Sequence, residues 1–260
     1  MWVFIVFVLW IICQSLIFAV PKGVMAWAAR ATTNCLASPD NLAKWKKIVD
    51  PKCPLCSTSP CTLGHLLSSC KEALDRFEWR HNNIVHYLYS TLSSQRLDGV
   101  EVYADLEGLR VNGVTIPPDL AVSAQKPDLV IVKRKSKEVK LVELTVPWDS
   151  SNNMAAAVQR KTDRYQGLST EIMSNGYKCD NTPLEVGTRG MINQRNRAVI
   201  TNLCHDMKIK KAHMGPTAKN ANIVQKSLYI LSLGRASEII VNCVEEKINK
   251  HCQRHNGPEG

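Results

Sequence analysis

The sequence predicts a mixed α/β protein with a small metal-binding segment ahead of its main domain. Residues 128–133 and 139–146 are short runs of apolar and β-branched side chains separated by a basic, polar stretch, which is typical of a β-hairpin. Residues 74–92 and 151–175 carry apolar side chains at helical spacing on either side of it. Four cysteines and a histidine crowd into residues 53–70. Strands flanked by helices of this kind indicate an α/β domain.

The N-terminal 21 residues form a hydrophobic segment unlike the rest of the chain. Residues 1–20 carry no charge, and as a helix they would span about 30 Å, the hydrocarbon thickness of a bilayer. Lys22 and Arg30 follow, which favours a cytosolic C-terminal side, as in a signal anchor. We expect either an N-terminal hydrophobic helix that anchors the chain in a membrane or a leader that is not native to the domain behind it, such as translated intronic sequence.

Residues 27–73 are predicted to contain a linker helix and a small zinc module. Ser38 is a good N-cap and Pro39 suits the first helical position, so the helix is expected to run through Ile48.

The zinc module is indicated by the spacing of its ligands, C-x2-C-x8-H-x4-C. Cys53 and Cys56 are predicted on a tight turn, and His65 and Cys70 on one face of a short helix, which gives four ligands for a tetrahedral Zn²⁺. Cys61 is a further thiol that could replace His65 or stay outside the site. Because so small a segment has little core of its own, we expect it to unfold without the metal.

The remaining elements begin with a helix and continue with short strands, the last two of which carry the acids, before a further helix and strand. We expect the helices and strands at 74–92, 100–105, 111–116, 128–133, 139–146, 151–175, 184–188, 192–207 and 222–250.

Each strand of the predicted hairpin carries one carboxylate. Asp128 begins the first strand, and Glu143 lies within the second, among apolar residues. A carboxylate is costly to bury unless it is paired or holds a cation, and oxygen ligands suit Mg²⁺. Two acids on adjacent strands therefore suggest a divalent-metal site; the alternative is that both are solvated acids at strand ends.

The chain is basic, with a formal net charge of +10. Such an excess favours a polyanionic partner, nucleic acid first and an acidic membrane surface second. Residues 133–140 and 208–211 form two clusters of lysine and arginine, and the alternative for each cluster is a solvated loop.

Together these features resemble the C-terminal region of site-specific non-LTR retrotransposon polyproteins, where a CCHC zinc knuckle precedes a restriction-like endonuclease of the PD-(D/E)XK type. The resemblance covers about residues 27–245 and consists of short matches in the same order. They are Asn41-Leu-Ala-Lys-Trp, Lys52-Cys-Pro-Leu-Cys with His65 and Cys70, Arg80-His-Asn-Asn-Ile, Lys126-Pro-Asp, Val142-Glu-Leu-Thr-Val-Pro-Trp, Arg160-Lys-Thr-Asp-Arg-Tyr and Glu185-Val-Gly-Thr-Arg-Gly. Neither residues 1–20 nor a reverse transcriptase is part of it.

The resemblance implies a PD-(D/E)XK nuclease-like αβββαβ core with a mixed sheet in residues 74–215, followed by a C-terminal helix and polar tail in residues 216–260.

The resemblance also implies the catalytic residues. Asp128 and Glu143 would hold Mg²⁺, with a backbone carbonyl next to Glu143 as a third ligand. Many such nucleases have a lysine two residues after the second acid, but this chain has Thr145 there. In the retrotransposon branch the lysine comes from the following helix, where Lys161 fits, with Tyr165 one turn further on.

DNA is the implied partner, and element RNA is a second candidate. The expected contacts with nucleic acid are Arg80, Lys126, Lys133, Arg134, Lys135, Arg164 and Arg189, of which Arg80 and Arg189 could equally be structural. Asp149 and Asp163 are nearby acids that we expect to be solvated rather than to bind metal.

Three functions are consistent with the sequence. The first is an endonuclease that nicks DNA so that the free 3′ end can prime reverse transcription, which implies a nuclear location. The second is a remnant that binds nucleic acid without cleaving it. The third is a membrane-anchored protein whose domain serves another purpose.

Overall fold

The computed structural model describes residues 22–110 and 115–209 of the 260-residue chain. The predicted hydrophobic helix at 1–20 and the predicted helix at 222–250 lie outside these residues, as does most of the predicted strand at 111–116. Within the described ranges, no helix is long and apolar enough to cross a membrane. The chain forms two compact units, and their boundary falls between Phe77 and Glu78.

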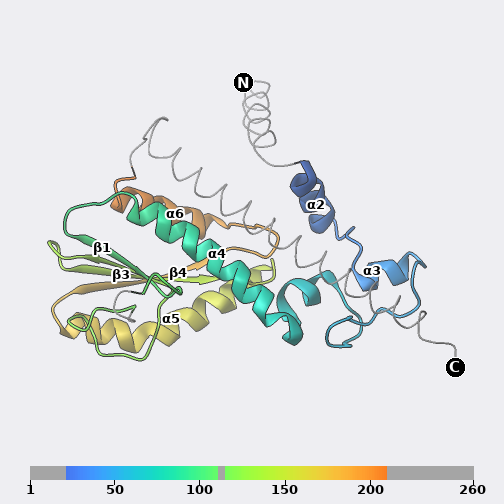
Figure 1. Cartoon of the computed structure of the whole chain (residues 1–260), viewed down its shortest axis with the longest axis horizontal. Helices are drawn as coiled ribbons and strands as arrows, with labels where there is room; N and C mark the ends of the chain where they lie inside the picture. The colour runs from blue at the N-terminus through green and yellow to red at the C-terminus, as the bar shows by residue number, and fades with distance from the viewer. Residues whose placement is uncertain (1–21, 111–114, 210–260) are drawn as a thin grey trace, which may run out of the picture. The chain divides into compact units, whose positions relative to one another are not determined.

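The described part of the first unit contains short helices joined by turns (Figure 1). They are α2 (Lys22–Thr32), α3 (Pro39–Lys44), the π-helical turn η1 (His65–Ser69) and the 3₁₀ turn η2 (Lys71–Ala73). Helix α2 was not predicted, and α3 starts where expected, with the Ser38 side chain accepting a hydrogen bond from the Asn41 amide at 3.3 Å.

Helix α3 ends at Lys44, four residues before the predicted end at Ile48. The reason is a Schellman motif, in which Lys46 adopts the left-handed conformation with φ 57°. The amides of Lys46 and Lys47 donate to the Ala43 and Leu42 carbonyls, both at 2.9 Å, and so satisfy the last carbonyls of the helix.

The second unit is a four-stranded mixed sheet with helices on both faces (Figure 1). Its elements are α4 (Leu74–Ser93, which begins in the first unit), β1 (Val100–Ala104), β2 (Leu129–Lys133), β3 (Glu138–Thr145), α5 (Ser151–Ser174), β4 (Lys178–Glu185) and α6 (Gln194–Asp206). The strands lie in sequence order. Strand β2 pairs antiparallel with both β1 and β3, and β4 pairs parallel with β3. The predicted mixed α/β class and the predicted hairpin are confirmed.

Successive side chains along each strand point to opposite faces of the sheet, and both faces are apolar. Leu129 and Ile131 of β2 pack with residues of α4 and α6, whereas Val130 and Val132 pack with residues of α5. Asp128 and Glu143 are two residues away from Val130 and Leu141, which face α5, so the same alternation assigns both acids to the α5 face.

Strand β4 begins at Lys178, six residues before the predicted start. Its first residues, Lys178-Cys-Asp-Asn-Thr, are polar and partly exposed because β4 is the edge strand beside β3. Their strand conformation comes from parallel pairing with β3 after the α5 crossover, which the local hydrophobic pattern does not show.

Candidate functional sites

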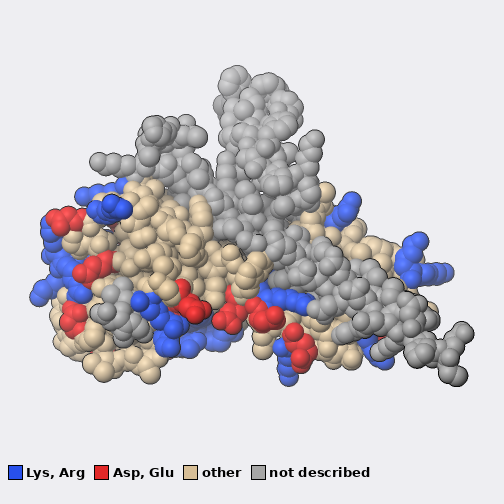
Figure 2. All heavy atoms as spheres, in the orientation of Figure 1, with Lys and Arg blue, Asp and Glu red and all other residues tan. Residues whose placement is uncertain are grey.

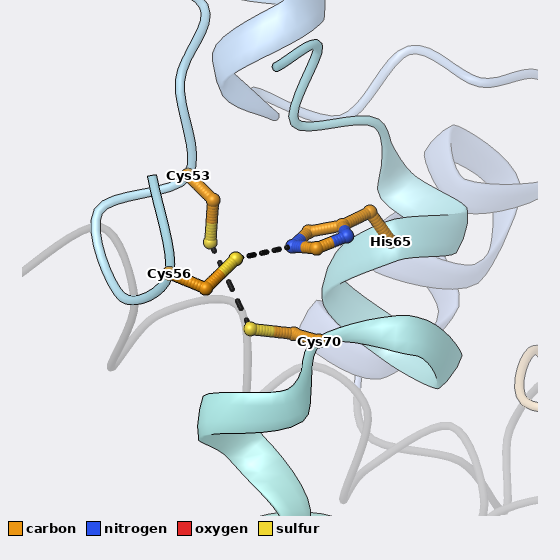
Figure 3. A group of neighbouring side chains, drawn as sticks. All are labelled: Cys53, Cys56, His65 and Cys70. Atoms are coloured by element: carbon orange, nitrogen blue, oxygen red, sulfur yellow. Dashed lines mark hydrogen bonds between the residues drawn. The ribbon is translucent and has the colours of Figure 1, made fainter. Parts of the chain in front are cut away.

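The four predicted zinc ligands lie together in the first unit (Figure 3). Their ligand atoms are all within 4.8 Å of one another; Cys53 Sγ is 3.9 Å from Cys70 Sγ, and Cys56 Sγ is 3.2 Å from His65 Nε2. Zn–S bonds of about 2.3 Å place the sulfurs of a tetrahedral site about 3.8 Å apart. The cluster can therefore hold a metal ion such as zinc.

Local backbone geometry places these ligands. The Ser57 amide donates to the Cys53 carbonyl at 2.9 Å and closes the turn that carries Cys53 and Cys56. His65 and Cys70 are joined by an i to i+5 hydrogen bond of 2.9 Å, so the expected short helix is a π-helical turn. Cys61 is fully buried and lies outside this set of ligands.

The thiols of this cluster differ in acidity. Burial would raise the pKa of Cys56, but hydrogen bonds with Thr58 outweigh it and lower the pKa to about 6. Burial raises the pKa of Cys70 to about 12.

The second unit brings Asp128 and Glu143 together at one end of the sheet. Leu129 is in register with Val142, so the two acids face each other across the next position of the hairpin. Glu143 Oε1 accepts from the Asp128 amide at 3.0 Å, and Asp128 Oδ2 accepts from the Leu144 amide at 2.8 Å. These bonds fix both carboxylates relative to the backbone.

Lys161 completes this arrangement from helix α5. Its Nζ donates to Glu143 Oε2 at 2.6 Å and lies 3.8 Å from Asp128 Oδ2. The structure therefore places Lys161 beside both acids, as expected for a lysine supplied by the helix, while Thr145 stays at the end of β3.

The two carboxyl groups have different acidities. Burial and the neighbouring charge of Asp128 raise the pKa of Glu143 to about 7, although Lys161 opposes the shift. Burial would raise the pKa of Asp128 as well, but the hydrogen bond from His81 and the charges of His81 and Lys161 hold it below its usual value.

His81 is a member of this site that the sequence did not reveal. Its Nε2 lies 3.2 Å from Asp128 Oδ2 and 3.3 Å from the Leu144 carbonyl oxygen, and its Nδ1 lies 3.1 Å from Asn82 Oδ1. Burial would lower the pKa of His81, but the bond with Asp128 raises it. The available signal was the Arg80-His-Asn-Asn-Ile match, but helical spacing alone leaves a histidine there as packing or surface.

Tyr165 was predicted to belong to the catalytic site and to touch the phosphate or the DNA backbone. Its side chain is only 1% exposed and packs in the core between α5 and the sheet. Its hydroxyl donates to the Lys126 carbonyl at 3.0 Å, and burial raises its pKa. Tyr165 therefore holds the segment that leads into Asp128.

Arg80 and Arg189, for which the sequence left a structural role open beside DNA contact, belong to a buried charge network. Arg80 is only 2% exposed; burial lowers its pKa to about 10, and the charge of Asp149 opposes that shift. Arg189 donates from Nε to Asp149 Oδ2 at 2.8 Å and stacks over Trp148 at 4.4 Å. The expectation that Asp149 is solvated was wrong, because its side chain is 3% exposed and paired with Arg189. Asp163 is exposed and accepts from Gln159 at 2.7 Å.

The predicted basic cluster at the hairpin turn is largely neutralised. Lys133 pairs with Glu138 at 3.2 Å, Arg134 with Glu101 at 2.9 Å and with Asp119, and Lys135 with Asp98. On the side shown in Figure 2, basic and acidic side chains lie close together. Lys133 also follows Asp128 by five residues along β2, about 16 Å away. These residues are therefore distant from the acids and do not form a free basic patch.

Lys126 and Arg164 are the predicted contacts that remain exposed near the acids. Lys126 precedes Asp128 by two residues, and Arg164 lies on α5 three residues after Lys161, with its guanidinium 5.5 Å from the Tyr165 ring centre.

Neither the models of known protein families nor the curated proteins contain a match to this chain. The site must therefore be interpreted from its own residues and geometry.

Proposed function

We propose that this chain is a metal-dependent DNA endonuclease of the PD-(D/E)XK type, derived from a non-LTR retrotransposon, that nicks one strand of its target for primed reverse transcription. The observation that carries the proposal is the meeting of Asp128, Glu143 and Lys161 at one end of the sheet. The αβββαβ order of α4 through β4 and the mixed sheet support it, since this order was expected from the resemblance.

The residues present fit a divalent cation such as Mg²⁺. Glu143 is fully buried beside a second carboxylate, and Lys161 offsets part of the resulting cost; a divalent cation would offset more of it. The Asp128 and Glu143 carboxylates would supply hard oxygen ligands, and so would the Leu144 carbonyl oxygen, which like Asp128 Oδ2 lies close to His81 Nε2.

The reaction is hydrolysis of a phosphodiester. A bound divalent cation would polarise the scissile phosphate and lower the pKa of the attacking water. Water oxygen bonds to phosphorus and the P–O3′ bond breaks, which leaves a 5′-phosphate and a 3′-hydroxyl. Lys161, held by both acids, is placed to donate to a non-bridging phosphate oxygen as negative charge develops there. Lys126 and Arg164 would contact the flanking DNA backbone.

In the first unit, we propose Zn²⁺ as the metal of the Cys53, Cys56, His65 and Cys70 cluster, where it would have a structural role. All four positions are filled by protein side chains, so the ion has no open position for a substrate.

The proposal is tested by conversion of supercoiled plasmid to the nicked form in the presence of Mg²⁺ or Mn²⁺. Asp128→Ala, Glu143→Ala and Lys161→Ala should each reduce nicking by at least about 100-fold. Asp163→Ala is the matched control, because this acid is exposed on α5 and outside the site. Nicking that persists in both Asp128→Ala and Glu143→Ala would refute the proposal. Salt-sensitive DNA binding without cleavage by the unmodified chain would favour the inactive remnant.

The proposed DNA contacts are tested separately by binding. Lys126→Ala and Arg164→Ala should weaken DNA binding and each reduce the slope of log affinity against log salt by about one. Lys135→Ala serves as the control, because this lysine pairs with Asp98 at the far end of the hairpin.

A further inference from the structure

A small pocket lies in the segment of the second unit that leads into Asp128. It is lined by residues of the segment 115–126, and its volume is about 180 Å³. We propose that this pocket binds one unpaired nucleobase of the DNA, next to the phosphate that is cut. This inference rests on the proposed function and adds a substrate preference to it, namely DNA in which a base near the nick has left the duplex.

The segment that forms the pocket is fixed to helix α5. Hydrogen bonds connect it to the helix and to the residue that caps the helix C-terminus. They join Asn175 Nδ2 to the Leu120 carbonyl at 2.9 Å, Glu171 Oε1 to the Val122 amide at 2.9 Å, Gln125 Nε2 to the Arg164 carbonyl at 2.8 Å, and the Tyr165 hydroxyl to the Lys126 carbonyl at 3.0 Å. A site that is held in place before its ligand arrives loses less conformational freedom on binding, so this segment suits recognition.

The size and lining of the pocket suit the flat ring of a base. Pockets for drug-sized ligands begin at about 300 Å³, so this one has room for a base but not for a whole nucleotide. Its walls include the apolar residues Ile116, Pro118 and Ala124. Thr115 and Ser123 add hydroxyl groups, which can donate hydrogen bonds to the edge of a ring or accept them. A base within a duplex is stacked on both sides, so it must leave the stack before it can enter.

Two exposed basic side chains lie beside the pocket. Lys126 is part of its lining, and Arg164 is joined to it through the hydrogen bond with Gln125. Lys126 precedes Asp128 by two residues, so at most about 7 Å of chain separates them. Cations in this position match the phosphates on either side of the scissile bond. The nucleotide whose base enters the pocket is therefore the one at the cut or next to it.

The test compares the affinity of the full-length chain for two short DNA duplexes that differ in one group. One carries a single unpaired adenine and the other has an abasic residue in its place, so both can bend alike but only the first offers a base to bury. Ca²⁺ replaces Mg²⁺, so that binding is measured apart from nicking. The unmodified chain should bind the duplex with the adenine about 10-fold more tightly.

The variant that fills the pocket is Ala124→Phe. Because Ala124 is exposed, the fold can accept the ring, which should occupy the pocket and remove the preference. Binding of the abasic duplex should stay unchanged, and this also reports that the variant is folded. Two controls should keep the preference. Ala124→Gly adds no bulk, and Ala198→Phe adds the same ring to the exposed surface of α6, on the other face of the sheet.

Equal affinity of the unmodified chain for the two duplexes, or a preference that Ala124→Phe leaves intact, would overturn the proposal. The plasmid-nicking assay is independent of this result. If nicking depends on Asp128 and Glu143 but the base preference is absent, the pocket assignment fails and the nuclease stands. If the preference is present and Ala124→Phe removes it, but no DNA is nicked under any condition, the pocket stands and the nuclease fails.

Discussion

At the scale of single residues, Glu143 illustrates how a proposed catalytic group can oppose folding. It is fully buried beside Asp128, and its pKa is raised from 4.5 to about 7. A carboxyl whose pKa is higher in the folded state binds protons more tightly there, so its contribution to stability is most favourable below pH 4.5 and declines as the pH rises to about 7. At neutral pH, without a divalent cation, ionised Glu143 costs up to about 3 kcal/mol.

Glu143→Gln should therefore abolish nicking and yet make the chain more stable. Measured by urea denaturation at pH 7.5 without added Mg²⁺ or Mn²⁺, the gain should be about 1–3 kcal/mol, and stability should change less between pH 4.5 and 7 than in the unmodified chain. Glu138→Gln, on the partly exposed start of the same strand, is the control. A Glu143→Gln variant that is less stable at pH 7.5 would contradict this account.

Arg189 presents the opposite case, a charge that stabilises the fold. It pairs with the buried Asp149 and stacks on Trp148, so Arg189→Ala leaves a carboxylate buried without this partner and should cost about 3–5 kcal/mol. Arg189→Lys should recover only part of this loss, because lysine lacks the planar group that stacks. Lys135→Ala, which breaks an exposed pair with Asp98, should cost less than about 1 kcal/mol. If Arg189→Ala kept full stability and lost DNA affinity, the original prediction of a DNA contact would be restored.

At the scale of elements, two glycines should respond in opposite ways to the same substitution. Gly187 follows β4, and a Cβ there would lie 1.4 Å from Asp149 Oδ1, in a carboxylate whose other oxygen, Oδ2, pairs with Arg189. Gly187→Ala should therefore cost about 1–3 kcal/mol or more. Gly167 lies within α5 with open space where a Cβ would be, so Gly167→Ala should add about 0.5–1 kcal/mol. Thermal unfolding of both variants measures this, and shifts of the same sign would contradict it.

Elements with a strong local signal were predictable from the sequence. The hairpin, α4 and α5 have apolar spacing and clear boundaries, and each lies within a few residues of its prediction. The start of β4 and the end of α3 were not predictable in the same way. The start of β4 depends on its pairing with β3. The end of α3 depends on the left-handed conformation of Lys46, a position where the sequence has no glycine to indicate a helix end.

Residues of the candidate sites, too, were predictable where the local sequence carries a strong signal. Asp128 and Glu143 stand out because acids within apolar strands are unusual, and the cysteine spacing identifies the ligands of the first unit. His81 was missed, and the burial of Tyr165 and the pairing of Arg189 with Asp149 could not be predicted, because the surroundings of these residues come from distant elements. A histidine on a polar helical turn looks like surface until the sheet brings Asp128 to it.

At the scale of the whole molecule, the two units should depend on different forces. The second has apolar clusters on both faces of its sheet. The first buries few large side chains among its described residues, chiefly Leu63, Leu66 and Leu67 beside the ligands.

Removal of the metal should therefore unfold the zinc module and spare the sheet. For so small a segment the free energy of metal binding is largely free energy of folding. With a zinc chelator, or in Cys56→Ser, amides in residues 53–73 should lose protection in hydrogen exchange, while those of β2 and β3 keep theirs. Cys35→Ser is the control, because this cysteine is exposed and outside the ligand set. Equal loss of protection in both units would mean that the metal supports the whole chain, whereas unchanged protection in the module would mean that its folding does not need a metal.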